Sequence, residues 1–242
     1  MSDGSRTVDD VKALHQTLEG FDSQLTSKFY DTWAETYNQD MKLMNYRSPN
    51  LAVNILDANF SGNREEARVL DVACGSGQVA KLMVELGFRD FTGVDGSKGM
   101  LELAAKTGLY RELKLALLGP EQLPAQTDMF DAVIIAGAMD VGFAPVSVVR
   151  ELCAAAKPGG FICISRGDHT ATSSIQYKKE LERELQLMED EGLWTQVGIN
   201  ETDKYMENPH LSIERAEELQ QKGRYISGKV YLYKKSINSN QK

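Results

Sequence analysis

The stretch that decides the fold is Val69-Leu70-Asp71-Val72-Ala73-Cys74-Gly75-Ser76-Gly77, which is followed further on by Gly93-Val94-Asp95. The apolar, β-branched beginning of the first run is typical of a buried parallel strand. Its glycines let the backbone turn, so that main-chain N–H groups come close to a ligand at the start of the next helix. Asp95 ends a second buried strand, where its carboxylate can accept hydrogen bonds from both hydroxyls of a ribose. The two runs together predict a nucleoside-binding α/β site.

Strand-like and helix-like segments alternate outward from this stretch. Strands are predicted near 68–73, 90–95, 113–118, 130–136 and 160–166. Helices are predicted near 77–86, 97–107 and 145–156. This alternation implies a parallel sheet with helices on both faces. A charged amphipathic helix at 175–191 and a last pair of strands near 193–199 and 226–234 predict an antiparallel hairpin at the sheet edge.

The chain ahead of the first strand is predicted to be largely helical. A weak helix is expected at 8–18, a second at 29–41, and a third from Ser48-Pro49, which supply a serine cap and a proline start. We expect a single domain over 25–235, in which 25–60 forms a helical lid. The domain is flanked by a polar, partly helical or loose segment at 1–24 and a disordered tail at 236–242.

Composition narrows the class of protein. With 242 residues and 42% hydrophobic content, the chain can build one α/β domain with a core of ordinary size. The net charge of -8 disfavours a nucleic-acid or anionic-membrane partner. The N-terminus has no apolar segment of the secretory type, and no apolar run approaches the length of a bilayer span. We therefore expect a monomeric cytoplasmic protein, with the nucleus as another compartment, and neither a nucleic-acid nor a membrane partner.

The glycine loop departs from the dinucleotide fingerprint G-x-G-x-x-G, because Ala73 stands at its first position and no third glycine follows. It resembles instead the first motif of the class I S-adenosylmethionine (SAM)-dependent methyltransferases, which runs acid-x-G-x-G-x-G. The runs 93–101, 130–136 and 157–160 resemble the second motif, the fourth strand and the turn before the fifth strand of that family. The resemblance implies a Rossmann-like α/β fold: a seven-stranded, mostly parallel sheet with an antiparallel edge hairpin and helices on both faces.

The resemblance also implies where SAM, or its product S-adenosylhomocysteine (SAH), would bind. The methionine part would face the glycine loop, the ribose would face Asp95, and the adenine would lie between Met100 and the end of the third strand. Many relatives carry an aspartate at about the position of Gly119, so the contact with the adenine amino group stays open. The predicted cofactor-binding residues of this core are Asp71, Ala73, Gly75, Gly77, Asp95, Gly96, Met100, Leu118, Gly119 and Ala136.

An aromatic stripe precedes the core. The run Phe29-Tyr30-Asp31-Thr32-Trp33-Ala34-Glu35-Thr36-Tyr37 resembles a segment of many small-molecule methyltransferases, and most closely of the methyltransferase-like proteins of the Williams–Beuren region group. Tyr30, Trp33 and Tyr37 share one helix face and can close over a sulfonium, which aromatic faces attract. Core packing is an equal alternative for Trp33. Tyr46, in a similar group motif, is a further candidate for the cofactor pocket.

Methyl transfer to a nucleophile requires alignment above all, with a base only where the acceptor must lose a proton. His169 and Arg166 follow the fifth strand, where substrate-facing loops emerge, and they are the candidate catalytic residues. An imidazole that titrates near neutrality can act as a base, although an idle loop histidine is the alternative. His15 and His210 are assigned no role.

No metal site is predicted. Asp140 and Asp168 each follow a strand, but no Asp-Asn pair completes a magnesium site of the catechol-methyltransferase type. The three cysteines lack C-x-x-C spacing, so neither a disulfide framework nor a zinc site is expected. Cys74, in the glycine loop, is interpreted as a packing residue because no partner that would activate it is evident.

These observations predict a SAM-dependent methyltransferase that acts on a small molecule or on an exposed protein side chain. One alternative is a module that binds SAM or SAH without catalysis and acts through protein contacts. A second is a nucleotide-sugar or NAD enzyme of related topology, which the missing third glycine disfavours.

Overall fold

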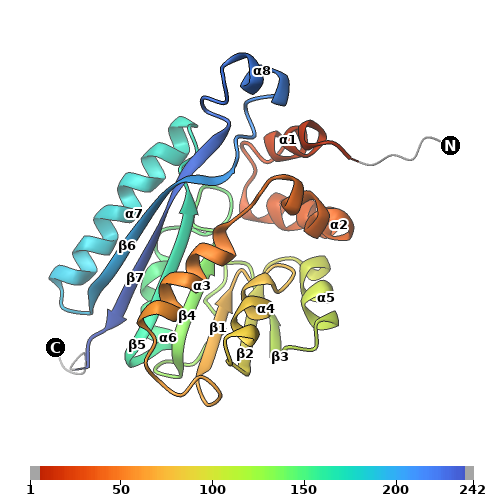
Figure 1. Ribbon diagram of the computed structural model, residues 1–242. Helices are drawn as coiled ribbons and strands as arrows, with labels where there is room; N and C mark the ends of the chain where they lie inside the picture. Colours follow the sequence, from red (N-terminus) through yellow and green to blue (C-terminus); the bar gives the residue numbers. More distant parts are fainter. Residues whose placement is uncertain (1–5, 238–242) are drawn as a thin grey trace.

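A seven-stranded sheet in the order β3-β2-β1-β4-β5-β7-β6 forms the centre of the molecule in a computed structural model that describes residues 6–237 (Figure 1). The strands are β1 (Arg68–Val72), β2 (Asp90–Asp95), β3 (Tyr110–Leu115), β4 (Phe130–Ala136), β5 (Ala156–Gly167), β6 (Trp194–Glu207) and β7 (Tyr225–Lys235). The helices are α1 (Val8–Gln16), α2 (Ser23–Leu43), α3 (Ser48–Asn59), α4 (Gln78–Glu85), α5 (Lys98–Lys106), α6 (Val148–Ala155), α7 (Thr172–Asp190) and α8 (Ile213–Glu218). The predictions for the outermost residues at each end, 1–5 and 238–242, lie outside the described residues.

Helices cover both faces of the sheet because successive side chains of a strand point to opposite faces. On β1, Val69 packs with α3 and α4 on one face, whereas Leu70 packs with α6 and α7 on the other. β1, β2, β3, β4 and β5 pair in parallel, and β7 pairs antiparallel with both β5 and β6. The predicted class I Rossmann-like fold with an antiparallel edge is therefore confirmed.

The strand order reverses beside β1, which lies between β2 and β4. In open α/β sheets, ligands bind outside the carboxyl ends of the strands at such a point. α1 and α2 lie above this end of the sheet in Figure 1. The fold therefore places the N-terminal helices next to the expected ligand site.

The third strand occupies 110–115 rather than the predicted 113–118. β2 ends at Asp95, which pairs with Leu115, and the last backbone contact runs from the Ala116 N–H to the Asp95 carbonyl oxygen at 3.0 Å. Beyond that point β3 has no strand to pair with. The apolar run that the sequence offered as a strand end therefore becomes a loop, which carries Leu117 and Leu118 past the sheet.

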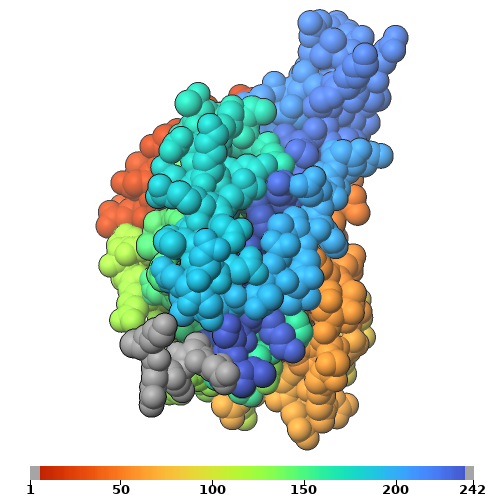
Figure 2. All heavy atoms as spheres, turned by 90° about the vertical axis from the view of Figure 1, so that its left-hand side faces the viewer, coloured from red at the N-terminus to blue at the C-terminus, as the bar shows by residue number. Residues whose placement is uncertain are grey.

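The edge strand β6 is longer than predicted: it continues beyond the expected end at 199 to Glu207. Its charged middle, near 201–204, is exposed, but Tyr205 and Met206 are buried in a cluster with Trp33 of α2 and Val11 of α1. The extension of the strand is thus stabilised by the N-terminal helices. Figure 2 shows the face that carries α7 and β6, and the segment around α8, which was not predicted, projects at its top.

Helix α2 begins at Ser23, six residues before the predicted start at 29. Asp22 caps it, and its side chain accepts a hydrogen bond from the Leu25 N–H at 2.8 Å. An aspartate in this position is a recognised helix-start signal. The extra turns bring Thr26 and Ser27 to the ligand end of the sheet.

Candidate functional site

A cavity of about 430 Å³ lies at the carboxyl ends of the parallel strands, next to α1 and α2. Its size falls within the usual range for small-molecule sites, about 300–1,000 Å³. Most of the predicted cofactor-binding residues line it, namely Tyr30, Tyr37, Tyr46, Ala73, Gly75, Asp95, Gly96, Met100, Leu118 and Ala136. The remaining four, Trp33, Asp71, Gly77 and Gly119, are not part of this lining.

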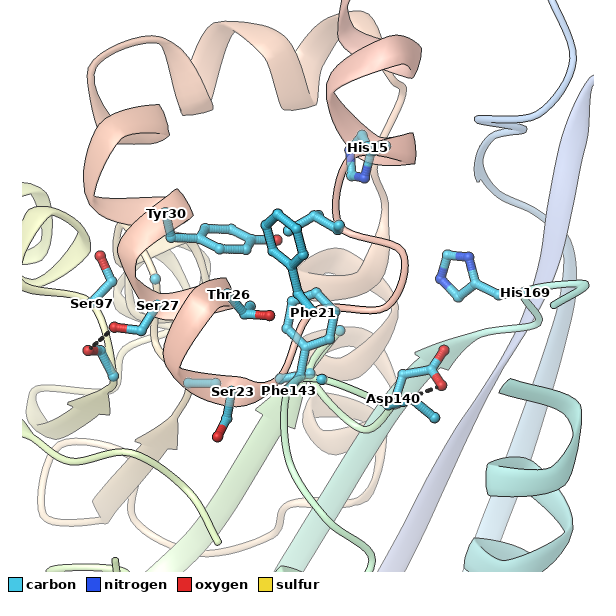
Figure 3. A pocket seen from close by; sticks show the side chains of 18 of the residues that line it. His15, Phe21, Ser23, Thr26, Ser27, Tyr30, Ser97, Asp140, Phe143 and His169 are labelled. Atoms are coloured by element: carbon cyan, nitrogen blue, oxygen red, sulfur yellow. Dashed lines mark hydrogen bonds between the residues drawn. The ribbon is translucent and has the colours of Figure 1, made fainter. Parts of the chain in front are cut away.

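Two groups of residues face this cavity from different parts of the fold. The glycine-loop half comes from the ends of β1, β2 and β3 and comprises Ala73, Gly75, Asp95, Gly96, Ser97, Met100, Leu117 and Leu118. The histidine half comes from α1, the loop between α1 and α2, the start of α2, the loops after β4, β5 and β6 and the start of α7. It comprises His15, Glu19, Phe21, Thr26, Asp140, Phe143, His169, Ala171, Ser173, Ser174 and His210. Figure 3 shows Ser97 on one side of the space and His169 on the other.

Asp95 is the charged centre of the glycine-loop half. One carboxylate oxygen accepts a hydrogen bond from the Gly75 N–H at 2.8 Å, and the other accepts one from the Ser97 N–H at 2.8 Å. Burial raises the pKa of Asp95 to about 6 against the opposing effect of these N–H groups. A carboxylate offers about four acceptor positions, so two remain for the hydroxyls of a ligand.

The glycine loop has the left-handed backbone that glycine favours. Gly75 has a φ of 52° and Gly77, which precedes α4, a φ of 85°. Ala73 also has a positive φ, 52°, although it carries a Cβ. A methyl group on Gly75 would meet no atom of the described chain within 4 Å. Open space above this glycine leaves room for a ligand to approach the backbone.

Asp71 lies behind the loop, where it is 1% exposed. The Tyr110 hydroxyl donates to its Oδ2 at 2.6 Å. Burial raises the pKa of Asp71 to about 7, although the hydrogen bond from Tyr110 lowers it. Asp71 therefore supports the loop from inside the protein.

Two glycines set the wall next to β4. A Cβ on Gly137 would lie 1.7 Å from the Tyr46 hydroxyl oxygen, so this glycine lets Tyr46 reach the end of β4. A Cβ on Gly119 would lie 2.6 Å from the Pro145 ring, so Gly119 serves the packing of two loops. Gly137 was not singled out from the sequence, because only the three-dimensional approach of Tyr46 reveals its importance.

The aromatic stripe of α2 is divided between the cavity and the core. Tyr30 and Tyr37 line the cavity, and burial raises the pKa of both hydroxyls. Trp33 is 4% exposed, and its Nε1 donates to the Asp40 carboxylate at 2.7 Å. Its ring lies 5.4 Å from that of Tyr30 and 5.3 Å from that of Tyr37. Trp33 thus supports the two tyrosines from behind.

Helix α2 is hydrogen-bonded directly to the glycine-loop half. The Ser76 hydroxyl and the Gln78 amide donate to Asn38 Oδ1 at 2.6 Å and 2.8 Å. The Ser97 hydroxyl donates to Asp31 Oδ1 at 2.6 Å. These anchors were missed in the sequence, although Asp31 and Asn38 lie within the quoted aromatic run and its continuation, because polar positions on a helix look like a solvated face.

The histidine half brings together all three histidines of the chain, His15, His169 and His210. Burial lowers the pKa of His15 to about 4 and also lowers the pKa of His169. The His15 ring packs edge-on against Trp33 at 5.0 Å. No role was predicted for His15 of α1 and His210 of the loop after β6, which line the same cavity and belong to segments that are hydrogen-bonded to each other.

Arg166 does not line the cavity but lies behind Asp140. It is 2% exposed, its Nε donates to the Met139 carbonyl oxygen at 3.2 Å, and its guanidinium lies 3.6 Å from Asp140 and 3.8 Å from Asp168. The guanidinium therefore balances the Asp140 charge. The two candidate catalytic residues occupy different places, since His169 faces the cavity and Arg166 does not.

A second cavity of about 460 Å³ adjoins the first and shares several lining residues with it: Tyr37, Met41, Tyr46, Ala73, Gly75 and Ala136. Its other walls carry amide, hydroxyl and cationic side chains, including Lys42, Arg47 and Gln78. The two adjoining cavities thus lie along the glycine loop, and the cationic side chains line the second cavity.

The described part of the chain contains no group of three or more histidine, cysteine, aspartate or glutamate side chains that could hold a metal ion. It also contains no helix that is both long and apolar enough to cross a lipid bilayer.

The fold is shared with solved structures of low sequence identity. The cyclase SpnF superposes with a TM-score of 0.63 and 14% identity, covering 90% of this chain and 97% of that chain. The YcgJ protein of Bacillus subtilis superposes with a TM-score of 0.53 and 19% identity, covering 78% of this chain and 100% of that chain. A cyclase among these neighbours illustrates that one fold can serve several reactions. The architecture identifies the class I methyltransferase fold, but it does not identify the reaction.

Sequence comparison identifies the family. The model of the methyltransferase domain matches residues 63–223, and the chain belongs to this SAM-dependent methyltransferase family. Human methyltransferase-like protein 27 is 45% identical over 166 residues, which are 69% of this chain and 66% of the human protein. The predicted family and its Williams–Beuren region group are confirmed.

Proposed function

We propose that the protein transfers a methyl group from SAM to a small-molecule acceptor. The observation that carries this proposal is the cavity, in which the glycine-loop half and the histidine half face one space. The first supplies groups suited to a nucleoside, and the second supplies a separate wall built from other segments of the chain. A transferase needs both, because it must hold the donor and the acceptor in one alignment.

The residues of the glycine-loop half fit SAM. Asp95 has acceptor positions left for the ribose hydroxyls, Met100 and Leu118 offer apolar contact to the adenine, and the space above Gly75 admits the cofactor to the backbone. Tyr37 and Ala136, which line both cavities, would contact the sulfonium end of the cofactor. Lys42 and Arg47, which line the second cavity, would balance the carboxylate of its amino-acid end.

SAM supplies an electrophilic methyl group: as the acceptor atom bonds to the methyl carbon, the carbon–sulfur bond breaks and its electron pair stays on sulfur. His169 lines the cavity, and burial lowers its pKa, which favours the neutral imidazole. Its imidazole receives the proton that a hydroxyl acceptor loses. Asp140 and Arg166 lie beside His169 as an ion pair, so its imidazole is surrounded by balanced charges.

The test is methyl transfer from radiolabelled SAM to fractionated cell extracts, separated into small-molecule and macromolecular pools. Label in the small-molecule pool, reduced in Asp95→Ala at a limiting SAM concentration, is the expected result. Label confined to proteins would overturn the small-molecule acceptor in favour of a protein side chain. If SAH binds but no fraction is labelled, the alternative of a binding module without catalysis is favoured.

A further inference from the structure

The histidine half contains a buried hydroxyl that the chain itself does not satisfy. Thr26 is 6% exposed, and within residues 6–237 its Oγ1 has no hydrogen-bond partner. A threonine in a helix can donate to a carbonyl of the preceding turn. Thr32 in the same helix does so, to the Phe29 carbonyl oxygen at 2.8 Å. Thr26 is instead one of the residues that line the cavity.

A second unpartnered polar atom lies on the same half. His15 Nε2 is buried and has no hydrogen-bond partner in the described part of the chain, and His15 lines the same cavity. Figure 3 shows Thr26 and His15 reaching the pocket from two different helices. Buried polar groups in proteins are nearly always hydrogen-bonded. Two exceptions within the histidine half indicate a missing partner that binds there.

The charged side chains of this half already have partners within the protein. Among the described residues, no lysine or arginine lines the cavity. Asp140 already faces the Arg166 guanidinium at 3.6 Å, and Glu19 is largely exposed beside His210 at 3.5 Å. A buried ion without a counter-charge is costly. An uncharged ligand avoids this cost.

The remaining walls suit a flat, apolar body. Phe21 and Phe143 line the histidine half, and the Phe143 ring lies 6.0 Å from that of Tyr30 in an edge-to-face arrangement. Aromatic rings favour such edge-to-face or offset contacts with another ring. The start of α7 lies at the same wall and has no side-chain cap, and the first N–H groups of a helix have no partner within it. These suit a hydroxyl or carbonyl oxygen.

We infer that the histidine half is the acceptor site and that it takes an uncharged aromatic compound with a hydroxyl group, of which phenol is the simplest example. A hydroxyl both donates and accepts, so it can satisfy Thr26 Oγ1 and His15 Nε2 and also reach His169. The inference rests on the proposed function for the direction of transfer. The expected binding preference depends only on the residues of the histidine half.

The test uses three probes of similar size that differ in charge: phenol, benzoate and benzylamine. Each is titrated by NMR into the whole protein, with and without saturating SAH. Phenol is expected to bind at least about tenfold more tightly than either charged probe, because no lysine or arginine of the described chain lines the cavity for benzoate and both carboxylates of this half are already paired. Equal or tighter binding of benzoate or benzylamine would overturn the inference, as would the absence of any preference.

Thr26→Val locates the binding site, since valine keeps the shape and removes the hydroxyl. Phenol affinity should fall by about fivefold, the effect of one lost hydrogen bond, while SAH affinity is unchanged. Thr32→Val, the same substitution at a satisfied, exposed position of α2, is the control and should alter neither affinity. Unchanged phenol binding in Thr26→Val would overturn the inference. Failure of SAH to bind, with phenol selectivity intact, would overturn the proposed function alone.

Discussion

The two halves of the cavity are built in different ways. The glycine-loop half comes from 73–118, a continuous part of the chain that forms the ends of three neighbouring strands. The histidine half comes from segments far apart in sequence, from His15 of α1 to His210 after β6. The first uses backbone turns and one carboxylate, whereas the second uses side chains brought together by tertiary packing.

This difference indicates how related proteins can bind the same cofactor while they act on different acceptors. A loop that binds through its backbone tolerates few changes, because the positive φ values of Gly75 and Gly77 restrict the residues allowed. The histidine half depends on loops, which can change without disturbing the sheet. The two halves should therefore respond independently to substitution.

The largest expected effect is at Asp95. Asp95→Ala should weaken SAH binding by about 1.5–3 kcal/mol, because it removes charge-assisted hydrogen bonds to the ribose. Calorimetric titration measures this loss, and Asp90→Ala at the opposite end of β2 is the control. Unchanged SAH affinity would show that Asp95 does not bind the ribose. The glycine-loop half would then not be distinguished from the histidine half as the cofactor site.

Gly137→Ala tests the boundary between the halves. The added methyl group meets the Tyr46 hydroxyl at a backbone position with a φ of 82°, so stability should fall by about 2 kcal/mol. Urea unfolding measures the change. Gly108→Ala, with a φ of 67° and no neighbour within 4 Å in the described chain, isolates the backbone strain. Adding Tyr46→Phe should recover part of the loss, and no recovery would show that the hydroxyl does not matter.

Cofactor affinity should depend on pH through Asp95. Burial raises its pKa to about 6, and the nearby Asp31 carboxylate adds to the rise. Ribose hydroxyls favour the ionised form, so binding is strongest above this pKa and weakens as the pH falls through it. From pH 7 to pH 5 the affinity of SAH should drop by about tenfold. In Asp95→Asn this dependence should disappear, and a persisting pH profile would assign it to another group.

The smallest expected effect is at the anchor of α2. Asn38→Ala removes the acceptor shared by Ser76 and Gln78 and should weaken SAH binding by about fivefold. Amide exchange in residues 25–45 should slow on adding SAH in the wild type, and less so in the variant. Asn54→Ala, on the exposed side of α3, is the control. Identical exchange with and without SAH would mean that α2 is not coupled to the cofactor.

The same division explains how much could be predicted from the sequence. Asp95 and the glycine loop were recognisable because local backbone chemistry requires those residue types at that spacing. β3 was displaced because its end depends on where its partner β2 stops. Thr26, Gly137 and His15 were missed, since each acquires its importance only from contact with a distant segment. The single domain over 25–235 stays a prediction.

The most direct test of the account is calorimetric titration of the wild-type protein with SAM and with SAH, using NAD as the control ligand in the same buffer. Binding of SAM and SAH in the micromolar range, near -8 kcal/mol, with none of NAD, is the predicted result. Absence of SAM and SAH binding, or binding of NAD in their place, would contradict it, because the glycine-loop half would then not be a SAM site.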